Sequence, residues 1–285
     1  MTLRVAPPAP ATAEALPEIA RLMERVVPRD RPWAPDLAWQ YLENPSGLAR
    51  YVNAYSEAGD LVAHYGVLPM PPLADAPVTL AGTYLSLNVV ADPAATVPGL
   101  MIATTRALYR SIQDEGPALV VGITNENSFQ GFVRVLGFRA LGRLSLTVHP
   151  PGRWPVVDTP RAFTSSPAHL AWRTARPGVR AFADQAKGTL MVRLQHLGLP
   201  IDAVLTTGQE SGAVGRLSLP ASAGLAPRLY AGFGGRVRGG VAVPARMRPS
   251  PLEYVFRVFG GGGPNDVLER HLAARRFEFL DFDVV

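Results

Sequence analysis

A loop followed by a helix is the first place in this sequence where chemistry is expected. Residues 91–110, ADPAATVPGLMIATTRALYR, place small residues between Pro93 and a segment with helical periodicity that begins at Gly99. Backbone amides at a helix start have no partner inside the helix, and the helix dipole adds positive potential, so such a loop can bind an anion. The alternative is an ordinary strand-to-helix connection, because glycine is common at this position.

A second polar group follows about two dozen residues later. Asn125 ends a predicted buried strand, Ser128 follows it, and Leu136-Gly137-Phe138 comes after a helical turn. The loop and this group together give a fixed order of strand, glycine loop, helix, strand, Asn-x-x-Ser, helix and Leu-Gly-Phe. That combination favours a ligand-binding interpretation of the loop over a purely structural one.

The elements that position these residues can be predicted from their patterns. We expect a helix over residues 12–27 capped by Thr12, a hairpin around Gly59 and one closing strand over residues 139–148. Strands are also expected at 83–91 and 118–124, and a helix at 99–116. In the second half we expect a hairpin around Gly188, strands at 203–208 and 228–235, a helix at 264–276 and a closing strand at 277–285.

The two halves resemble each other. Ala38-Trp39 and Ala171-Trp172 each precede an X-Pro turn, a strand, a glycine turn and a second strand. This similarity predicts a duplicated domain, and chance likeness between hairpins is the alternative. We therefore expect a first domain at 1–150, a linker rich in Pro and Ser at 151–168, and a second, degenerate domain at 169–285.

Composition limits the classes of function. The chain has 285 residues, 47% of them hydrophobic and 18% charged, which predicts a globular protein with a sizeable core. With no cysteine, disulfides and thiolate sites are excluded. The net charge of +5 comes from dispersed arginines, so we expect no nucleic-acid partner. No signal peptide or apolar span is visible, so a cytoplasmic protein without membrane association is expected.

Other glycine-rich segments and motif searches add no further chemistry. Residues 259–264, FGGGGP, lack the Lys-Ser/Thr of a phosphate-binding P-loop, and residues 234–240 are better interpreted as a hairpin turn. The sequence contains no HExxH motif, no clustered His/Asp triad and no serine elbow. We therefore expect neither a hydrolase nor a metal site.

Residues 36–148 resemble the core of the GNAT superfamily of acyl-CoA-dependent N-acyltransferases, on the motif order given above. The internal repeat extends the resemblance to tandem members. It implies an α+β fold of two GNAT-like domains, each a mixed, mostly antiparallel sheet flanked by helices. It also implies acetyl-CoA or another acyl-CoA as co-substrate and a small-molecule or peptide amine as acceptor.

The resemblance also implies which residues bind coenzyme A. The loop amides would hold the pyrophosphate, the preceding strand would pair with the pantetheine amides, and two polar side chains would lie beside the pantetheine arm. The residues concerned are, in that order, Thr96, Val97, Pro98, Gly99, Leu100 and Met101; Val89, Val90 and Ala91; Asn125 and Ser128.

The sequence departs from the family pattern in the loop and at the expected acid. Thr96 stands where a basic residue or glutamine is usual, and Met101 stands where a glycine or alanine is usual. Phe132 and Val133 stand where a tyrosine is common. The missing tyrosine leaves the general acid unassigned.

The general base is also left open. His64 is either the general base or a histidine packed in the sheet. Asp92 is either the general base or a carboxylate that fixes a turn. Asp281 and Asp283 share one face of the predicted last strand, lining a pocket or facing solvent. Some tandem relatives, the N-myristoyltransferases, are thought to use their C-terminal carboxylate, which here belongs to Val285. No catalytic residue is assigned.

Three functions remain open. The first is transfer of an acetyl or similar group from acyl-CoA to an amine. The second is a catalytically silent binding or accessory protein with this fold. The third is transfer of an aminoacyl group from a charged tRNA.

Overall fold

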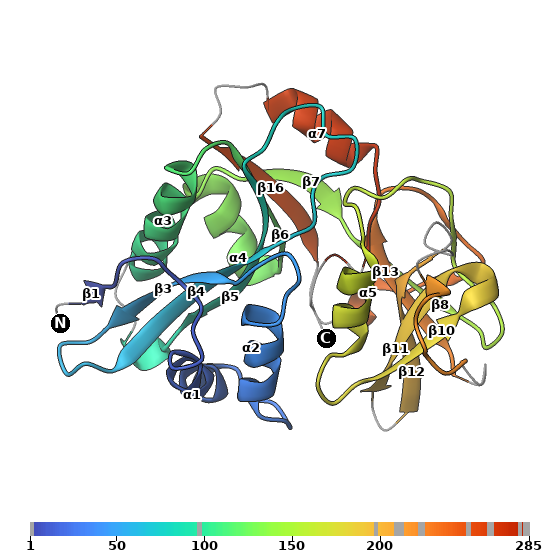
Figure 1. Cartoon of the computed structure of the whole chain (residues 1–285), viewed down its shortest axis with the longest axis horizontal. Coiled ribbons are helices and arrows are strands. Elements are labelled where there is room, and N and C mark those ends of the chain that lie inside the picture. Colours follow the sequence, from blue (N-terminus) through green and yellow to red (C-terminus); the bar gives the residue numbers. More distant parts are fainter. Residues whose placement is uncertain are drawn as a thin grey trace.

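The structure is a computed structural model that describes residues 3–95, 99–196, 199–207, 214–221, 226–248, 252–260, 265–278 and 281. Its described part contains two large mixed sheets with helices around them (Figure 1). The α+β class and the two-sheet architecture predicted from the sequence are confirmed.

The first sheet is built mostly from the N-terminal half. Its strands, in spatial order, are β1 (Arg4–Val5), β3 (Arg50–Tyr55), β4 (Leu61–Pro69), β5 (Gly82–Ala91), β6 (Ala118–Thr124), β16 (Glu253–Phe259) and β7 (Arg139–Arg143), with β2 (Ala9–Pro10) beside β3. All neighbours are antiparallel except β5 and β6. The hairpin predicted around Gly59 is β3–β4, and the turn glycine has φ +88°.

The second sheet uses the C-terminal half and one earlier strand. Its order is β10 (Arg180–Asp184), β11 (Thr189–His196), β12 (Leu199–Thr206), β13 (Arg228–Phe233), β8 (Ser145–His149) and β15 (Val241–Ala242), with β17 (Phe277–Glu278) also on β13. A small ribbon joins β9 (Val156–Val157) to β14 (Val237–Arg238). The hairpin predicted around Gly188 is β10–β11.

The two sheets exchange strands. The segment predicted as one strand over residues 139–148 is two strands, β7 and β8, which lie in different sheets and are separated by Leu144. Leu144 is buried, and its N–H donates to the Leu252 carbonyl at 2.9 Å, so the chain crosses between the sheets here. In return, β16 from the C-terminal half lies between β6 and β7. The division into domains at residues 150 and 169 stays a prediction. Two strands lie in the sheet of the other half: β8 in the second sheet and β16 in the first.

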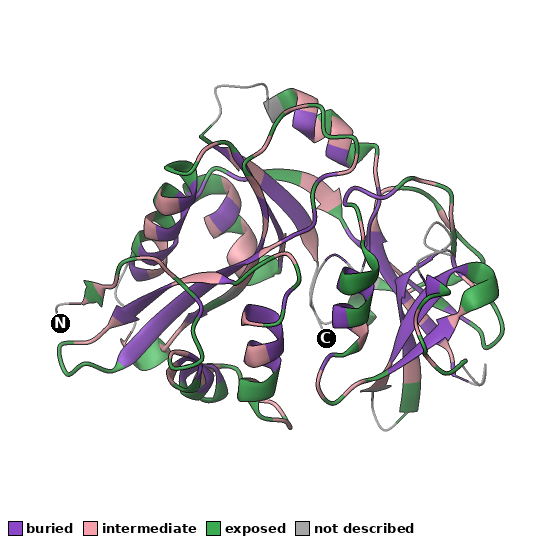
Figure 2. Ribbon diagram, viewed as in Figure 1, coloured by how far each residue is buried: buried purple, intermediate pink, exposed green. Residues whose placement is uncertain are grey.

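Helices cover both faces of the first sheet. Alternate residues of one strand enter different cores: Leu119 and Val121 pack in the cluster of α1 (Leu16–Val26) and α2 (Trp33–Tyr41), whereas Val120 packs against α3 (Leu100–Gln113). Figure 2 shows these strands buried and the outer helix surfaces exposed. Further helices are α4 (Glu126–Gln130), which continues as a π-helical turn at Gly131–Val135, α5 (Pro167–Thr174) and α7 (Asn265–Ala273).

The predicted cap of the first helix is wrong. Helix α1 begins at Leu16, and Ala15 precedes it without a side-chain cap. Thr12 lies in a turn before the helix, where its carbonyl accepts from the Ala15 N–H at 3.2 Å. Pro17 fits the first turn because it needs no intrahelical N–H donor there. Proline in the first turn was therefore the better start signal.

The halves meet at the two tryptophans of the internal repeat. The rings of Trp39 in α2 and Trp172 in α5 are stacked, with centroids 4.7 Å apart and planes at 19°. Each indole N–H donates to the other's backbone carbonyl, Trp39 to Trp172 at 2.8 Å and Trp172 to Trp39 at 2.9 Å. The contact is reciprocal, as expected where two copies of one unit face each other. It supports the duplication predicted from the sequence.

Candidate functional site

The central parallel strands of the first sheet part at their carboxyl ends. β5 and β6 are paired from Gly82–Ala118 to Ser86–Gly122, and their pairing stops there. Beyond this point β5 stays with β4 as far as Ala91, and β6 stays with β16 as far as Thr124. Within the described residues, the edge of β5 from Leu87 to Ala91 that faces β6 therefore has no strand partner. We call this opening the first split.

A β-bulge bends β5 at the first split. Between the pairs Gly66–Leu87 and His64–Val90, two residues of β5, Asn88 and Val89, lie opposite Tyr65 alone. Such a bulge turns the strand away and leaves backbone N–H and C=O groups free for an extended ligand. Val89, Val90 and Ala91, which were predicted to pair with pantetheine, lie on this segment.

Helix α3 begins beside the end of β5. Gly99 has φ +83° and is the N-cap residue, and a Cβ added to it would meet no atom within 4 Å. The first hydrogen bond of the helix runs from the Ala103 N–H to the Gly99 carbonyl at 2.9 Å, so the amides of Leu100 and Met101 are not used inside the helix. Thr96, Val97 and Pro98 lie outside the described residues. The described part of the loop thus offers an open helix start.

Asn125 and Ser128 lie where β6 enters α4, and they bond to each other. The Asn125 side-chain oxygen accepts from the Ser128 N–H at 3.0 Å, and the Asn125 N–H donates to Ser128 Oγ at 3.1 Å. This capping box gives both residues a structural role in starting α4. Asn125 is also exposed, and it follows the carboxyl end of β6 as predicted, whereas its contact with a ligand stays a prediction.

A hydroxyl network below the split was missed by sequence reasoning. Ser86 is the last residue of β5 paired with β6, and its Oγ accepts from the Tyr65 hydroxyl at 2.9 Å. The Tyr65 hydroxyl also bonds to that of Tyr109 in α3. Burial raises the pKa of both tyrosines, so they stay protonated at neutral pH. The signal was available as Tyr109, a polar-tipped residue on the apolar stripe of α3.

His64 is a structural histidine. It is fully buried, its Nε2 lies 2.7 Å from the Tyr41 hydroxyl, and its Nδ1 lies 2.7 Å from the Asn53 side-chain oxygen. A neutral ring satisfies both contacts by accepting from Tyr41 and donating to Asn53. Burial lowers the pKa of His64 to about 3, so it is neutral at physiological pH and both nitrogens are occupied. The interpretation as a packed sheet residue is confirmed.

Asp92 is a turn carboxylate. It accepts from the Ala94 N–H at 2.9 Å and from Arg25 Nε at 2.8 Å. The bond from the Ala94 amide, followed by that from Arg25, lowers the pKa of Asp92. Its bonds fix the turn that leads from β5 toward α3.

The second sheet has a corresponding opening, between β12 and β13, which we call the second split. These parallel strands pair from Asp202–Arg228 to Val204–Tyr230 and then separate. Here β17 occupies the gap: Phe277 and Glu278 pair with Phe233 and Gly232 of β13. The opposite edge of β13 is held by β8.

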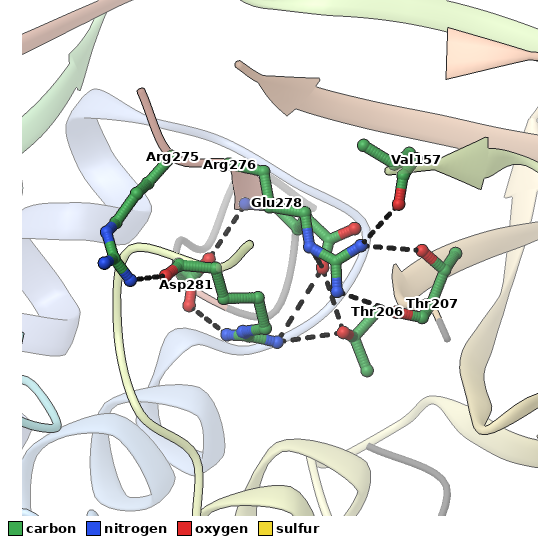
Figure 3. A network of polar contacts seen from close by, with 8 residues as sticks. Val157, Thr206, Thr207, Arg275, Arg276, Glu278 and Asp281 are labelled. Carbon is green, nitrogen blue, oxygen red and sulfur yellow. Dashed lines mark hydrogen bonds and ion pairs between the residues drawn. The ribbon is translucent and has the colours of Figure 1, made fainter. Parts of the chain in front are cut away.

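Charged side chains join β17 to the end of β12 (Figure 3). Arg276 donates to the Thr207 carbonyl at 2.7 Å, and Glu278 accepts from the Thr206 hydroxyl at 2.9 Å. Arg161 pairs with Asp281, and burial raises the pKa of Asp281 and of Glu278. The predicted closing strand is therefore wrong at Asp281, which lies in a buried turn and not on a solvated strand face. Asp283 and Val285 lie outside the described residues.

Among the described residues, no group of three or more His, Asp or Glu could hold a metal ion. No described helix has the length and apolar character needed to cross a bilayer. A cavity of about 700 Å³ lies at the opposite end of β5, lined by Arg50, Tyr84 and His169 among others, and so is separate from the first split.

Comparison with known proteins identifies the fold. No sequence profile of a known family and no curated protein sequence matches the chain. The structure is similar to that of a GCN5-related N-acetyltransferase from Anabaena variabilis, with TM-score 0.54 and 12% identity over 89% of this chain and 72% of that one. It is also similar to a conserved protein of unknown function from Enterococcus faecalis, with TM-score 0.52 and 10% identity over 91% and 73%.

Both matches extend over about nine tenths of the chain and therefore include both sheets. At such low identity the similarity establishes the fold. The chain therefore has the GNAT fold in the tandem arrangement that its sequence predicts.

Proposed function

We propose that this protein is an acyl-CoA-dependent N-acyltransferase, with acetyl-CoA as the favoured donor, and that it binds the donor in the first split. The observation that carries the proposal is the edge of β5 from Leu87 to Ala91, which no described strand pairs with, next to the open start of α3 at Gly99. An extended chain with two amides fits a free strand edge, and a diphosphate fits a helix start. Coenzyme A has both parts in one molecule.

The reaction needs few protein groups. A neutral amine attacks the thioester carbonyl, the C–S bond breaks, and the amine loses a proton while the coenzyme A thiolate leaves. We assign stabilisation of the developing oxyanion to a backbone amide of β5 in the split. Phe132 and Val133 supply no acid at the usual position, so we assign protonation of the thiolate to water. The Ser86 hydroxyl, held by Tyr65, is the polar side chain at the base of the split.

Acetyl-CoA binding by two Gly99 variants tests the proposal. Both Gly99→Asp and Gly99→Asn place a side chain in open space, and both residue types tolerate positive φ better than other side chains do. Only Asp brings a charge that repels a diphosphate. We expect isothermal titration to show a Kd for Gly99→Asp at least about tenfold above that of Gly99→Asn, the scale of one charge-assisted hydrogen bond. Equal affinities for the two variants would remove the first split as the diphosphate site.

A catalytically silent binding protein is the second candidate. The absence of an acid at Phe132 and Val133 and the neutral, fully bonded state of His64 favour it. Acetyl-CoA binding without turnover on a panel of amines, with turnover measured as the release of free coenzyme A thiol, would establish it. Aminoacyl transfer from tRNA remains a third possibility that leaves the open helix start without a role.

A further inference from the structure

Four arginines surround one cavity on the face of the first sheet that α3 covers. Arg106 and Arg110 come from α3, Arg134 from the π-helical turn after α4, and Arg257 from β16, and the cavity measures about 360 Å³. Among the described residues no carboxylate lines it, since its other polar side chains are those of Gln113 and Tyr109. The cavity therefore concentrates positive charge from three separate parts of the chain.

These arginines lack acidic partners within the described part of the chain, where other arginines, such as Arg139 and Arg193, pair with acids. Arg257 donates to the Leu136 carbonyl and lies over the Phe259 ring at 4.4 Å, which fixes its guanidinium at the cavity wall. Burial, and to a smaller extent repulsion from Arg106, lowers the pKa of Arg257. The contacts of Arg257 thus keep its guanidinium close to Arg106 although the two charges repel each other.

Helix ends offset only part of this charge. Arg110 lies in the last turn of α3 and Arg134 in the last turn of the π-helical segment, where the carbonyl ends are negative. Each helix end contributes about half an elementary charge, so the two together supply about one negative charge against four positive ones. An excess of about three positive charges is left for a ligand.

We propose that this cavity binds a small molecule carrying a diphosphate or two phosphoryl groups. Guanidinium groups recognise phosphate oxygens through paired hydrogen bonds, and four of them exceed what one carboxylate or one phosphate can use. A volume of about 360 Å³ is at the lower end of the range for small-molecule sites, so a compact ligand fits better than a polymer.

The arginine cavity is separate from the first split. Arg106 and Arg110 follow Gly99 by two to three helical turns, about 10 to 16 Å along α3 at 1.5 Å per residue. The cavity therefore lies beside the C-terminal half of the helix whose N-terminus is proposed to hold coenzyme A. Binding at one site leaves the other open.

Inorganic pyrophosphate is the probe, titrated calorimetrically into the full chain at constant ionic strength. Arg106→Glu/Arg134→Glu reverses two exposed charges in the cavity, and Arg21→Glu/Arg236→Glu makes the same change in net charge at exposed sites elsewhere. We expect saturable binding whose Kd rises at least about tenfold in the cavity variant and less than about twofold in the control. Inorganic sulfate should bind at least about tenfold more weakly than pyrophosphate.

Several outcomes would overturn this assignment. They are the absence of saturable pyrophosphate binding, an equal loss in both variants, and sulfate binding as tight as pyrophosphate. Competition by saturating coenzyme A would assign the anion site to the acyl-CoA ligand instead. If coenzyme A does not bind at all, the proposed function fails while the arginine cavity is still tested by pyrophosphate alone.

Discussion

The two splits of this molecule begin alike and end differently. Each lies where two parallel strands part, β5 from β6 in the first sheet and β12 from β13 in the second. In the first split the edge of β5 is free among the described residues. In the second split the segment from Arg276 to Glu278 pairs with one strand through its backbone and with the other through its side chains. The same opening is the proposed ligand site in one half and part of the core in the other.

The buried polar groups beside each split differ in the same way. Next to the first split the network of Tyr41, His64 and Asn53 is neutral. The second split contains buried arginines and carboxylates, with Arg276 and Glu278 both fully buried. A neutral network can border an open cleft at little cost, whereas buried charges must keep their partners. This difference predicts that the second split cannot open without a large loss of stability.

The largest expected effect is therefore in the second split. Arg276→Met removes the guanidinium that bonds to Thr207 and lies 3.6 Å from Glu278, and it leaves a buried carboxylate with less compensation. We expect the free energy of unfolding to fall by about 3–5 kcal/mol. Arg238→Met, which breaks the exposed pair with Asp158, should cost at most about 1 kcal/mol. Denaturant unfolding of both variants measures this, and equal small losses would show that β17 is not held by its charges.

The second prediction uses pH to probe the neutral network. The pKa of His64 is about 3 in the folded protein against 6.5 when it is exposed, so the unfolded chain takes up a proton first as pH falls. The stabilisation is complete above pH 6.5 and decreases below it, by about 2 kcal/mol at pH 5.

His64→Gln should lack this part of the pH dependence when unfolding is measured at pH 7.5 and pH 5. Glu278 and Asp281, whose pKa values are raised, act in the opposite direction but equally in both proteins. Identical pH slopes for the two proteins would contradict the buried, neutral state of His64.

The third prediction tests the symmetry that makes the two splits comparable. Trp39→Phe and Trp172→Phe each remove one indole N–H and leave one interface carbonyl without its donor. We expect each to lower the free energy of unfolding by about 1–2 kcal/mol, and by similar amounts, because the contact is reciprocal. Trp33→Phe, a more exposed tryptophan that donates to Val27, should cost less. Strongly unequal losses at Trp39 and Trp172 would argue against a symmetric interface.

The sequence predicted the first split better than the second for a physical reason. Gly99, the hairpin at Gly59 and the strand before Asn125 are local features, set by turn geometry and by alternating apolar residues. The role of Asp281 depends on Arg161, which is far away in sequence, so the period-two pattern only placed it on a strand face that lines a pocket or faces solvent. Arg276, which bonds to the equally distant Thr207, was predicted to end the preceding helix. For the same reason the break at Leu144 was missed, because alternation continues across it while the sheets change.

The smallest expected loss of stability comes from Thr207→Val in the second split, and acetyl-CoA binding by this variant tests whether the two splits have different roles. Thr207→Val removes a hydroxyl that accepts from Arg276 at 3.2 Å, and because Arg276 keeps its bond to the Thr207 carbonyl, the loss should be about 1 kcal/mol. Acetyl-CoA titrations of this variant and of the parent should both give a single site, with Kd values within about twofold, since the first split contains no atom of Thr207. A Kd that rises along with the loss of stability would place the acyl-CoA site in the second half. A second equivalent of bound acetyl-CoA in the variant would show instead that β17 competes with the ligand for a split that is still functional, and the two openings would then differ only in occupancy.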